Sequence, residues 1–356
     1  MHGTYTQIIN ASIEWTKTIL FRPFNFKKWF FICIIAVLSA EFSGFNFNFN
    51  LPSGKFGSNE QQQSVTYNAE NQGVFCEIPT SGATQKKAEK EWPVIFIVGL
   101  ITAAVIVAIS FVVFFTWVYS RFSFVFLNCI VKNDASIKIP FSDTRIPGQS
   151  YFKWNIFMTC AFLAGLLVLV LVLIAGIFTL AKISPILKIL LILLWVLLVI
   201  GMVIVFAIVT VLTRDLILPV MYKNHRKIKD VWKEMLPLIR NESGEIFKYM
   251  MLKLGLRIAA AIVGGLAALA VIIGLMIPAG IIAGGMYFLF NMTPEYLKWG
   301  YIGLAIILGL MVVVFVIFVL NMVLLPISVF FKTFSLKFLA RLDSKYDAFS
   351  IKEVLS

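Results

Sequence analysis

Uncharged apolar runs alternate along the chain with segments rich in lysine and arginine, and this alternation predicts membrane-spanning helices. About 20 apolar helical residues cover the hydrocarbon core of a bilayer. On that criterion we predict six spans, at about 29–43, 93–120, 154–181, 187–213, 254–277 and 300–331. The third and fourth are joined by a very short connection, so they should be antiparallel neighbours. The predicted fold class is all-α integral membrane, with six transmembrane helices arranged as three helical hairpins.

Several breaks in the pattern set the expected ends of these spans. Arg121 is expected to stop the second span and Pro278 the fifth. The apolar stretch 279–290 is too short to cross again, so we place it at the outer surface or in a re-entrant segment. Residues 44–92 are polar and form the expected extracytoplasmic loop. Their alternating FNFNFN start permits a strand or hairpin, and a loop with little regular structure is the other interpretation.

Three further segments carry apolar residues at helical spacing, which is typical of amphipathic helices that lie in a membrane interface. The first is 6–21, interpreted either as an interfacial anchor or as a helix packed on a cytosolic loop. The second lies in the basic cytosolic segment 214–250, where the apolar positions are Ile228, Val231, Trp232, Met235, Leu236 and Ile239. The third is KTFSLKFLARL at 332–342. We expect all three on the cytosolic face.

A threefold repeat is suggested by the segments that precede spans one, three and five: FNFKKWFF at 24–31, YFKWNIF at 151–157 and IFKYMML at 246–252. Each has Phe-Lys followed closely by Trp or Tyr. Lysine favours the headgroup layer and the aromatic ring its boundary, although any inner interface accumulates both residue types. The expected headgroup contacts are Lys27, Lys28, Trp29, Arg121, Lys153, Trp154, Arg226, Lys227, Lys248 and Tyr249.

Composition supports the membrane assignment and adds an orientation. The 356 residues are 60% hydrophobic and 14% charged, whereas soluble domains carry about 25% charged residues. The formal net charge is +13, and the proposed inner segments hold 24 of the 31 lysines and arginines. Positive charge accumulates on the cytosolic side of membrane proteins, so both termini are expected in the cytosol of a cell whose inner membrane holds the protein. No basic stripe lies outside the membrane-adjacent segments, so we expect no nucleic acid.

Candidate chemistry is sparse. Two distant histidines and four cysteines indicate no metal site, no Ser-His dyad and no disulfide scaffold, and we expect no cofactor. Glu41 is expected to reach outer headgroups, or to act as a proton or ion ligand. Arg214 and Asp215 are expected to pair with each other or with Arg121, as a structural pair or a transport gate. Asn321 is expected to bond to a neighbouring helix.

Four stretches resemble a loose superfamily of prokaryotic multi-pass proteins that includes the membrane domain of some glycerophosphodiester phosphodiesterases. They are FRPFNFKKWF, TWVYSRFSFVFLNCIV with PFSDTRIPGQSYFKW, DLILPVMYKN with DVWKEMLPLI, and LPISVFFKTFSLKFLARLD. The resemblance implies six helices and an inner-membrane location. It implies no phosphodiesterase activity, because that chemistry belongs to a separate soluble barrel for which this chain has no room. No active-site residue is carried over.

The sequence supports three hypotheses for function. The first is a non-enzymatic membrane protein whose basic inner surface contacts anionic lipid headgroups, or which serves as a subunit or scaffold with other membrane or cytosolic proteins. The alternative is a small-solute or lipid transporter, which would need polar groups near the bilayer midplane. An enzyme acting on lipid would need clustered acids, bases or a metal site, and no such constellation can be read from the sequence.

Overall fold

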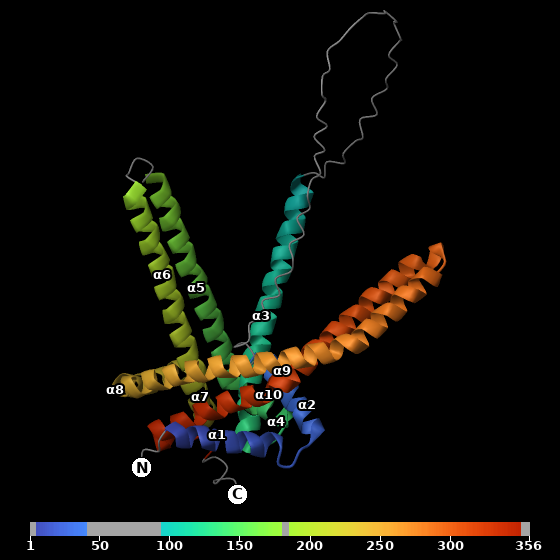
Figure 1. The fold of residues 1–356 in the computed structure, drawn as a ribbon. Coiled ribbons are helices and arrows are strands. Elements are labelled where there is room, and N and C mark those ends of the chain that lie inside the picture. Colours follow the sequence, from blue (N-terminus) through green and yellow to red (C-terminus); the bar gives the residue numbers. More distant parts are fainter. Residues whose placement is uncertain (1–4, 41–93, 180–184, 350–356) are drawn as a thin grey trace, which may run out of the picture. The chain divides into compact units, whose positions relative to one another are not determined.

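The computed structural model describes residues 5–40, 94–179 and 185–349, and these residues form helices and loops with no strand (Figure 1). The elements, in chain order, are α1 (Tyr5–Leu20), α2 (Phe26–Leu38), α3 (Val94–Lys132), α4 (Lys138–Asp143), α5 (Arg145–Thr179), α6 (Pro185–Leu212), the π-helix η2 (Thr213–Ile217), α7 (Leu218–Asn224), α8 (Ile228–Asn241), α9 (Ser243–Met292), the 3-10 helix η3 (Glu295–Leu297), α10 (Lys298–Leu342) and the 3-10 helix η4 (Ser344–Tyr346).

The chain divides into two units by its internal contacts. Residues 46–110 form the smaller unit, of which the described part is the beginning of α3. All contacts discussed below lie within the larger unit, 1–45 with 111–356. The loop predicted at 44–92 falls almost entirely in the smaller unit and lies outside the described residues.

Five helical segments among the described residues are long and apolar enough to cross a membrane: Val98–Lys132, Arg145–Gly176, Leu187–Asn224, Ser243–Met292 and Glu295–Leu342. Their apolar side chains are widely exposed, with Leu193 and Val263 each 65% accessible. Exposed apolar surface on this scale marks a membrane or protein interface. The helical fold class with several candidate spans is therefore confirmed, whereas six spans in three hairpins stay a prediction.

The predicted first span, 29–43, begins inside α2, which has only 13 residues and is not one of these five segments. A helix of that length covers about 20 Å, less than the ~30 Å hydrocarbon core. Each end of α2 makes a hydrogen bond to a residue near the end of another helix. Lys28 Nζ donates to Asn133 Oδ1 just beyond α3, at 2.6 Å. Just after α2, the Ala40 carbonyl accepts from Arg214 in η2. Four residues of α2 are buried, as expected of a helix packed in protein.

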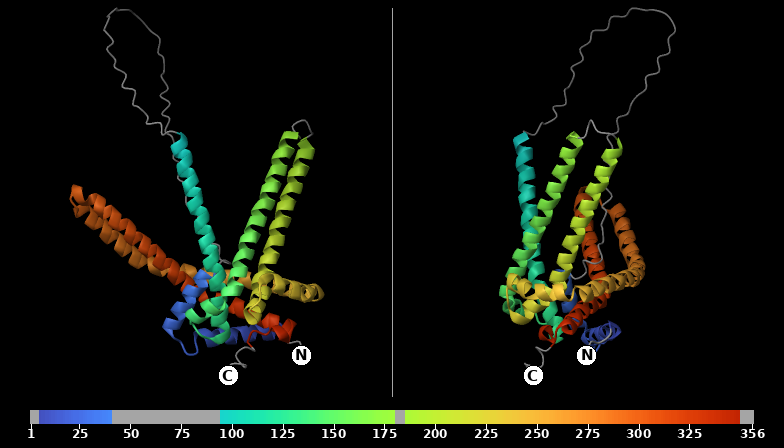
Figure 2. Two further views of the ribbon diagram at one scale, coloured as in Figure 1. Left: turned by 180° about the vertical axis from the view of Figure 1, so that it is seen from behind. Right: turned by 90° about the vertical axis from the view of Figure 1, so that its left-hand side faces the viewer.

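Two pairs of consecutive long helices lie side by side. Trp195 Nε1 of α6 donates to the Leu169 carbonyl of α5 at 2.8 Å, and Phe162 and Phe206 meet with ring centroids 5.1 Å apart. The two helices run together in both views of Figure 2. Helices α9 and α10 pack in the same way, with the short η3 between them.

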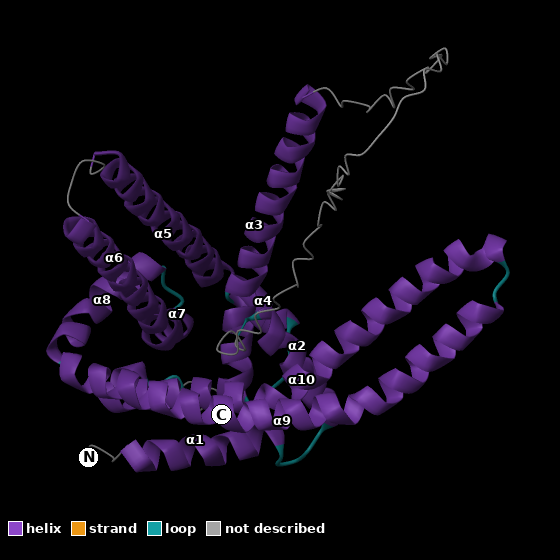
Figure 3. Cartoon of the chain, turned by 45° about the horizontal axis from the view of Figure 1, so that its top comes forward, coloured by secondary structure: helices purple, strands orange, loops and turns teal. Residues whose placement is uncertain are grey.

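The buried core lies where helix ends meet. We call this region the junction. It comprises α1, α2, α3 from Phe124 onward, α5 at Tyr151, η2, α7, the inner face of α8, α9 up to Lys253, α10 from Leu324 onward, and η4 at Tyr346. Figure 3 shows that it is built from helices and short loops, without a sheet. Within it, α1 lies along the C-terminal part of α10, so the helix predicted at 6–21 packs on protein.

Three predicted helix ends are wrong. Arg121 does not stop the second span, because α3 continues to Lys132. Pro278 does not end the fifth, because α9 runs through it to Met292, so 279–290 is helix rather than a separate re-entrant segment. Residues 332–342 are the end of α10, and Phe334, Phe338 and their neighbours are buried in the junction rather than lying in an interface. A proline weakens a helix locally, but a long apolar helix on both sides tolerates it.

Candidate functional site

A π-helix positions Arg214 and Asp215 at the end of α6. In a π-turn each N–H bonds five residues back, and the Leu218 N–H indeed bonds to the Thr213 carbonyl instead of that of Arg214. The next possible donor is Pro219, which has no N–H and whose ring would clash with a carbonyl in a regular helix. The Arg214 carbonyl therefore loses its helical donors, and it accepts from Lys332 Nζ at 3.3 Å.

Asp215 forms a buried ion pair with Lys253 of α9, and their side chains are only 6% and 5% accessible. The Tyr249 hydroxyl donates to the same carboxylate oxygen at 3.1 Å. The Tyr249 ring stacks on Phe338, with centroids 4.0 Å apart, and this contact fixes the hydroxyl. The predicted partners were Arg214 and Arg121, so the structure corrects this pairing. Tyr249 is 1% accessible and does not lie at the headgroup boundary predicted for it.

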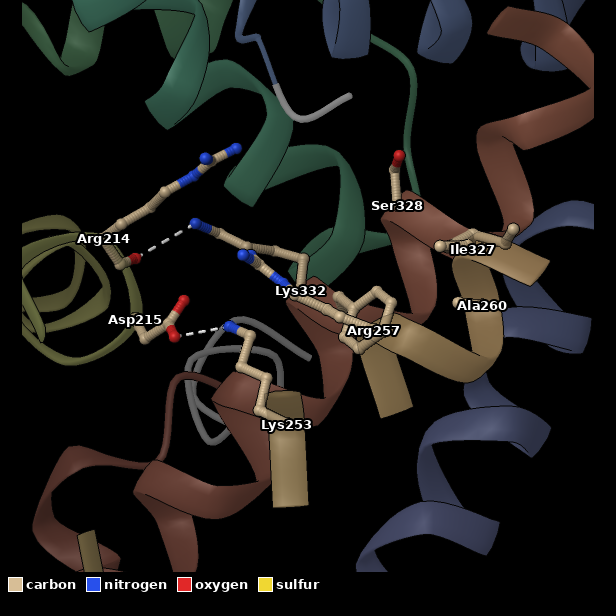
Figure 4. Close-up of a pocket in the computed structure, with 10 residues that line it drawn as sticks. Arg214, Asp215, Lys253, Arg257, Ala260, Ile327, Ser328 and Lys332 are labelled. Atoms are coloured by element: carbon tan, nitrogen blue, oxygen red, sulfur yellow. Dashed lines mark hydrogen bonds and ion pairs between the residues drawn. The ribbon is translucent and has the colours of Figure 1, made fainter. Parts of the chain in front are cut away.

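Four cationic side chains gather around this carboxylate (Figure 4). Arg214, Lys253, Arg257 and Lys332 line, together with Asp215, a cavity of about 40 Å³ between η2, α9 and α10. The guanidinium of Arg257 lies over the Phe331 ring, 5.7 Å from its centroid. The remaining lining side chains are small or apolar: Ala260, Ala261, Ile327, Ser328 and Phe331. Such a set can attract an anion and can hold it through several charged donors.

A second, larger cavity lies between the start of α5 and the start of α8. Its volume is about 850 Å³, and its lining includes Lys153, Trp154, Phe157, Lys227 and Lys229. The Ser150 hydroxyl accepts from the Ile228 N–H at 3.0 Å, and Trp154 packs against Trp232 of α8 with the ring centroids 5.9 Å apart. These contacts hold the two helices together. We call this cavity the basic groove. It brings together three residues predicted to contact headgroups: Lys153, Trp154 and Lys227.

Arg121 takes a different role from the one predicted. It is 7% accessible, and its guanidinium lies 4.9 Å over the Phe141 ring and 6.0 Å from Trp117. Gly148 at the start of α5 permits this position, because a Cβ there would come within 2.8 Å of the Arg121 side chain. Arg121 therefore packs α3, α4 and α5 together instead of contacting headgroups.

Other predicted residues lie around the junction without forming one site. Lys27 is exposed, and the Trp29 indole caps the end of α1 by donating to the Leu20 carbonyl at 2.7 Å. Arg226 pairs with Glu234 at 3.3 Å, and Lys248 pairs with Glu245 at 3.0 Å.

The polar groups predicted within spans have mixed outcomes. The side-chain amide of Asn321 donates to the Ile317 carbonyl of its own helix at 2.7 Å, instead of to the neighbouring helix that was predicted. Glu41 lies outside the described residues. Among the described residues no group of three or more potential metal ligands occurs.

Sequence reasoning missed Lys253, Arg257 and Lys332 as members of the site. Asp215 lies 38 positions before Lys253 in the chain, and Arg214 lies 118 before Lys332, so no local pattern links them. One signal was present: Lys253 and Arg257 fall at the start of a long apolar run, and ionisable residues beside or within such runs commonly pair with one another or mark a functional site.

The described part of the chain holds five apolar helices long enough to cross a bilayer, with cations collected where helix ends meet, and these features define a membrane protein. The chain belongs to a family of unknown function, DUF7544, which matches it over residues 5–349. No curated protein and no solved structure matches it.

Proposed function

We propose that this chain is a non-enzymatic, multi-pass membrane protein that recruits anionic lipid headgroups to its junction through the basic groove. The observation that carries the proposal is the lining of the groove, which holds three exposed lysines, one exposed carboxylate (Asp230) and the aromatic residues Trp154 and Phe157. Lysine contributes about 1 kcal/mol near an anionic membrane surface. Trp154 and Phe157 provide the apolar surface on which the glycerol and upper acyl region of a lipid can rest.

The proposal includes a location and an orientation. The excess of lysine and arginine on the junction segments favours a cytosolic junction with both termini in the cytosol, in the inner membrane of the cell. The resemblance to multi-pass prokaryotic proteins supports the same location. A scaffold role alongside other membrane or cytosolic subunits is compatible with the proposal, since the spans expose much apolar surface that lipid or protein can cover.

Lipid retention tests the proposal. The full-length protein, purified in a mild detergent, is incubated with equal amounts of phosphatidylglycerol and phosphatidylcholine, and the retained lipids are quantified by mass spectrometry. We expect phosphatidylglycerol to be enriched several-fold, and the enrichment to fall with rising salt because exposed charges are screened. Equal retention of the two lipids would contradict the proposal.

A matched pair of variants locates the effect. Replacing Lys153, Lys227 and Lys229 with glutamine is expected to remove most of the enrichment, because all three line the groove. The control replaces Lys233 and Arg240 with glutamine. These residues are exposed on the same helix, α8, and do not line the groove. A similar loss in both variants would indicate nonspecific attraction to net charge.

A further inference from the structure

We propose that the cavity between η2, α9 and α10 is a binding site for a single phosphate group, held by Arg257, Lys332 and their cationic neighbours. This site is separate from the basic groove, shares no lining residue with it, and does not require the groove to bind lipid. The ligand class is a phosphate-bearing anion. It can be the headgroup of a membrane lipid or a phosphate from solution.

The first argument is charge. Four cations and one carboxylate line the cavity among the described residues, which leaves three positive charges in excess. Lys253 and Asp215 pair with each other, and Arg257 on the next turn of α9 adds a further cation to the same lining. Cations gathered at one cavity attract an anion, and a charged donor makes a stronger hydrogen bond to an anion than a neutral donor does.

The second argument is the supply of donors. The Arg257 guanidinium lies over the Phe331 ring, and within the described residues it makes no hydrogen bond or ion pair. A guanidinium presents a planar fork of N–H groups that matches two phosphate oxygens, and stacking on a ring leaves that fork free. Figure 4 shows Arg257 beside Lys332 on the wall of the cavity. A fork and a neighbouring ammonium form a common arrangement for binding phosphate.

The third argument is size and surroundings. A cavity of about 40 Å³ holds on the order of three waters, which is comparable to the exposed oxygens of one phosphate group. A nucleotide or a sugar phosphate would not fit inside it. On one side the wall is formed by Ala260, Ala261 and Ile327, which are small or apolar. An acyl-bearing molecule can pass along this side with its phosphate inside the cavity.

Two binding measurements separate the sources. In the lipid arm, the full-length protein is placed in nanodiscs of phosphatidylcholine with a minor fraction of phosphatidic acid. The protein is then released from the nanodiscs inside a mass spectrometer, and the lipid molecules that stay bound to it are counted. In the solution arm, delipidated protein in detergent is titrated with inorganic phosphate, and binding is monitored through the line width of the phosphorus NMR signal. We expect one phosphate-bearing molecule per chain in at least one arm, with Arg257→Gln weakening that binding at least tenfold.

Controls make each outcome decisive. Lys248→Gln removes a cation from the surface of the same helix and should leave both arms unchanged. Retention of phosphatidic acid that depends on Arg257 assigns a lipid ligand, and Arg257-dependent broadening with inorganic phosphate alone assigns a solution ligand. Equal binding by the wild type and a folded Arg257→Gln variant in both arms overturns the proposal. If that variant does not fold, Arg257→Lys replaces it. This variant keeps the charge but loses the fork, so unchanged binding would again overturn the proposal.

The two proposals can fail separately. Replacing the three groove lysines should leave the single retained phosphate unchanged, and Arg257→Gln should leave the bulk enrichment of phosphatidylglycerol unchanged. Loss of the retained phosphate in the groove variant would place it outside the cavity and would contradict the present inference.

Discussion

Removing the Asp215 carboxylate should destabilise the protein more than removing the ammonium that pairs with it. Asp215→Asn eliminates the negative charge that the described residues supply to the cavity and leaves all four cations in place. Lys253 then keeps a charge at 5% side-chain accessibility without its counter-charge. Breaking a buried pair in this way costs about 3–5 kcal/mol.

Lys253→Met has a smaller expected cost, although it breaks the same pair. The carboxylate keeps the hydroxyl of Tyr249, which donates to it at 3.1 Å, and the neighbouring cations Arg257 and Lys332 remain to neutralise it. We expect a loss of about 1–3 kcal/mol, in the range for one strong hydrogen bond to a charged group. The double variant should be more stable than Asp215→Asn alone, because it no longer buries the unpaired ammonium.

Unfolding in mixed micelles with increasing dodecyl sulfate, followed by tryptophan fluorescence, measures these differences. Glu295→Gln is the matched control, because it breaks a Lys298 pair at the other end of the same helical pair, where the glutamate side chain is 90% accessible. Exposed pairs contribute at most about 1 kcal/mol. If Lys253→Met proved as destabilising as Asp215→Asn, or more so, the positive excess argued from the cavity lining would be refuted.

Two further predictions concern packing and pH. Gly148→Ala should cost about 1–3 kcal/mol, because its Cβ would lie 2.8 Å from Arg121 Cδ, whereas Gly244→Ala, with nothing within 4 Å, should be neutral or slightly stabilising in the same unfolding assay. A hydrogen bond from Lys345 lowers the pKa of Glu234 in the folded protein. The contact therefore stabilises the fold near η4 fully at pH values above the ordinary glutamate pKa of about 4.3. This stabilisation is lost as the pH falls through the lower pKa of the folded state. The protection factors for amide hydrogen exchange over 343–349, which are corrected for the intrinsic pH dependence of exchange, should therefore fall at low pH, and Glu234→Gln should remove most of that dependence.

The sequence predicted elements that local periodicity encodes. The apolar positions of 6–21 and 228–239 repeat at helical spacing, and both segments are helices with a buried face. The long apolar runs predicted six spans, and the last five of them coincide with the helices that are long and apolar enough to cross a membrane among the described residues. What could not be predicted was the surface that each amphipathic face covers. Interfacial lipid and a protein partner select the same pattern, so 332–342 looked like an interfacial helix although it is part of the core.

The candidate site was harder to predict because its members are distant in sequence. Arg214 and Asp215 stood out as charges at the end of an apolar run, but their partners on α9 and α10 are set by helix packing. The sequence predicts that Arg121 ends a helix, since a charge interrupts an apolar run there. Phe141 and Trp117 cover its guanidinium, so the helix continues past it. Charge in a sequence indicates where chemistry is possible, and tertiary packing decides whether the charge is solvated or enclosed.

The π-turn at 213–217 sets the orientation of everything that follows it. One added residue in a continuous helix rotates all later side chains by about 100° about its axis. Before this turn, most side chains of α6 are exposed, whereas those from Leu216 to Met221 are all buried. The inserted residue thus sets the rotation of the enclosed stretch relative to the exposed helix before it. Deleting a single residue here would turn every side chain of the enclosed stretch against a different neighbour, a far larger change than the loss of any one contact.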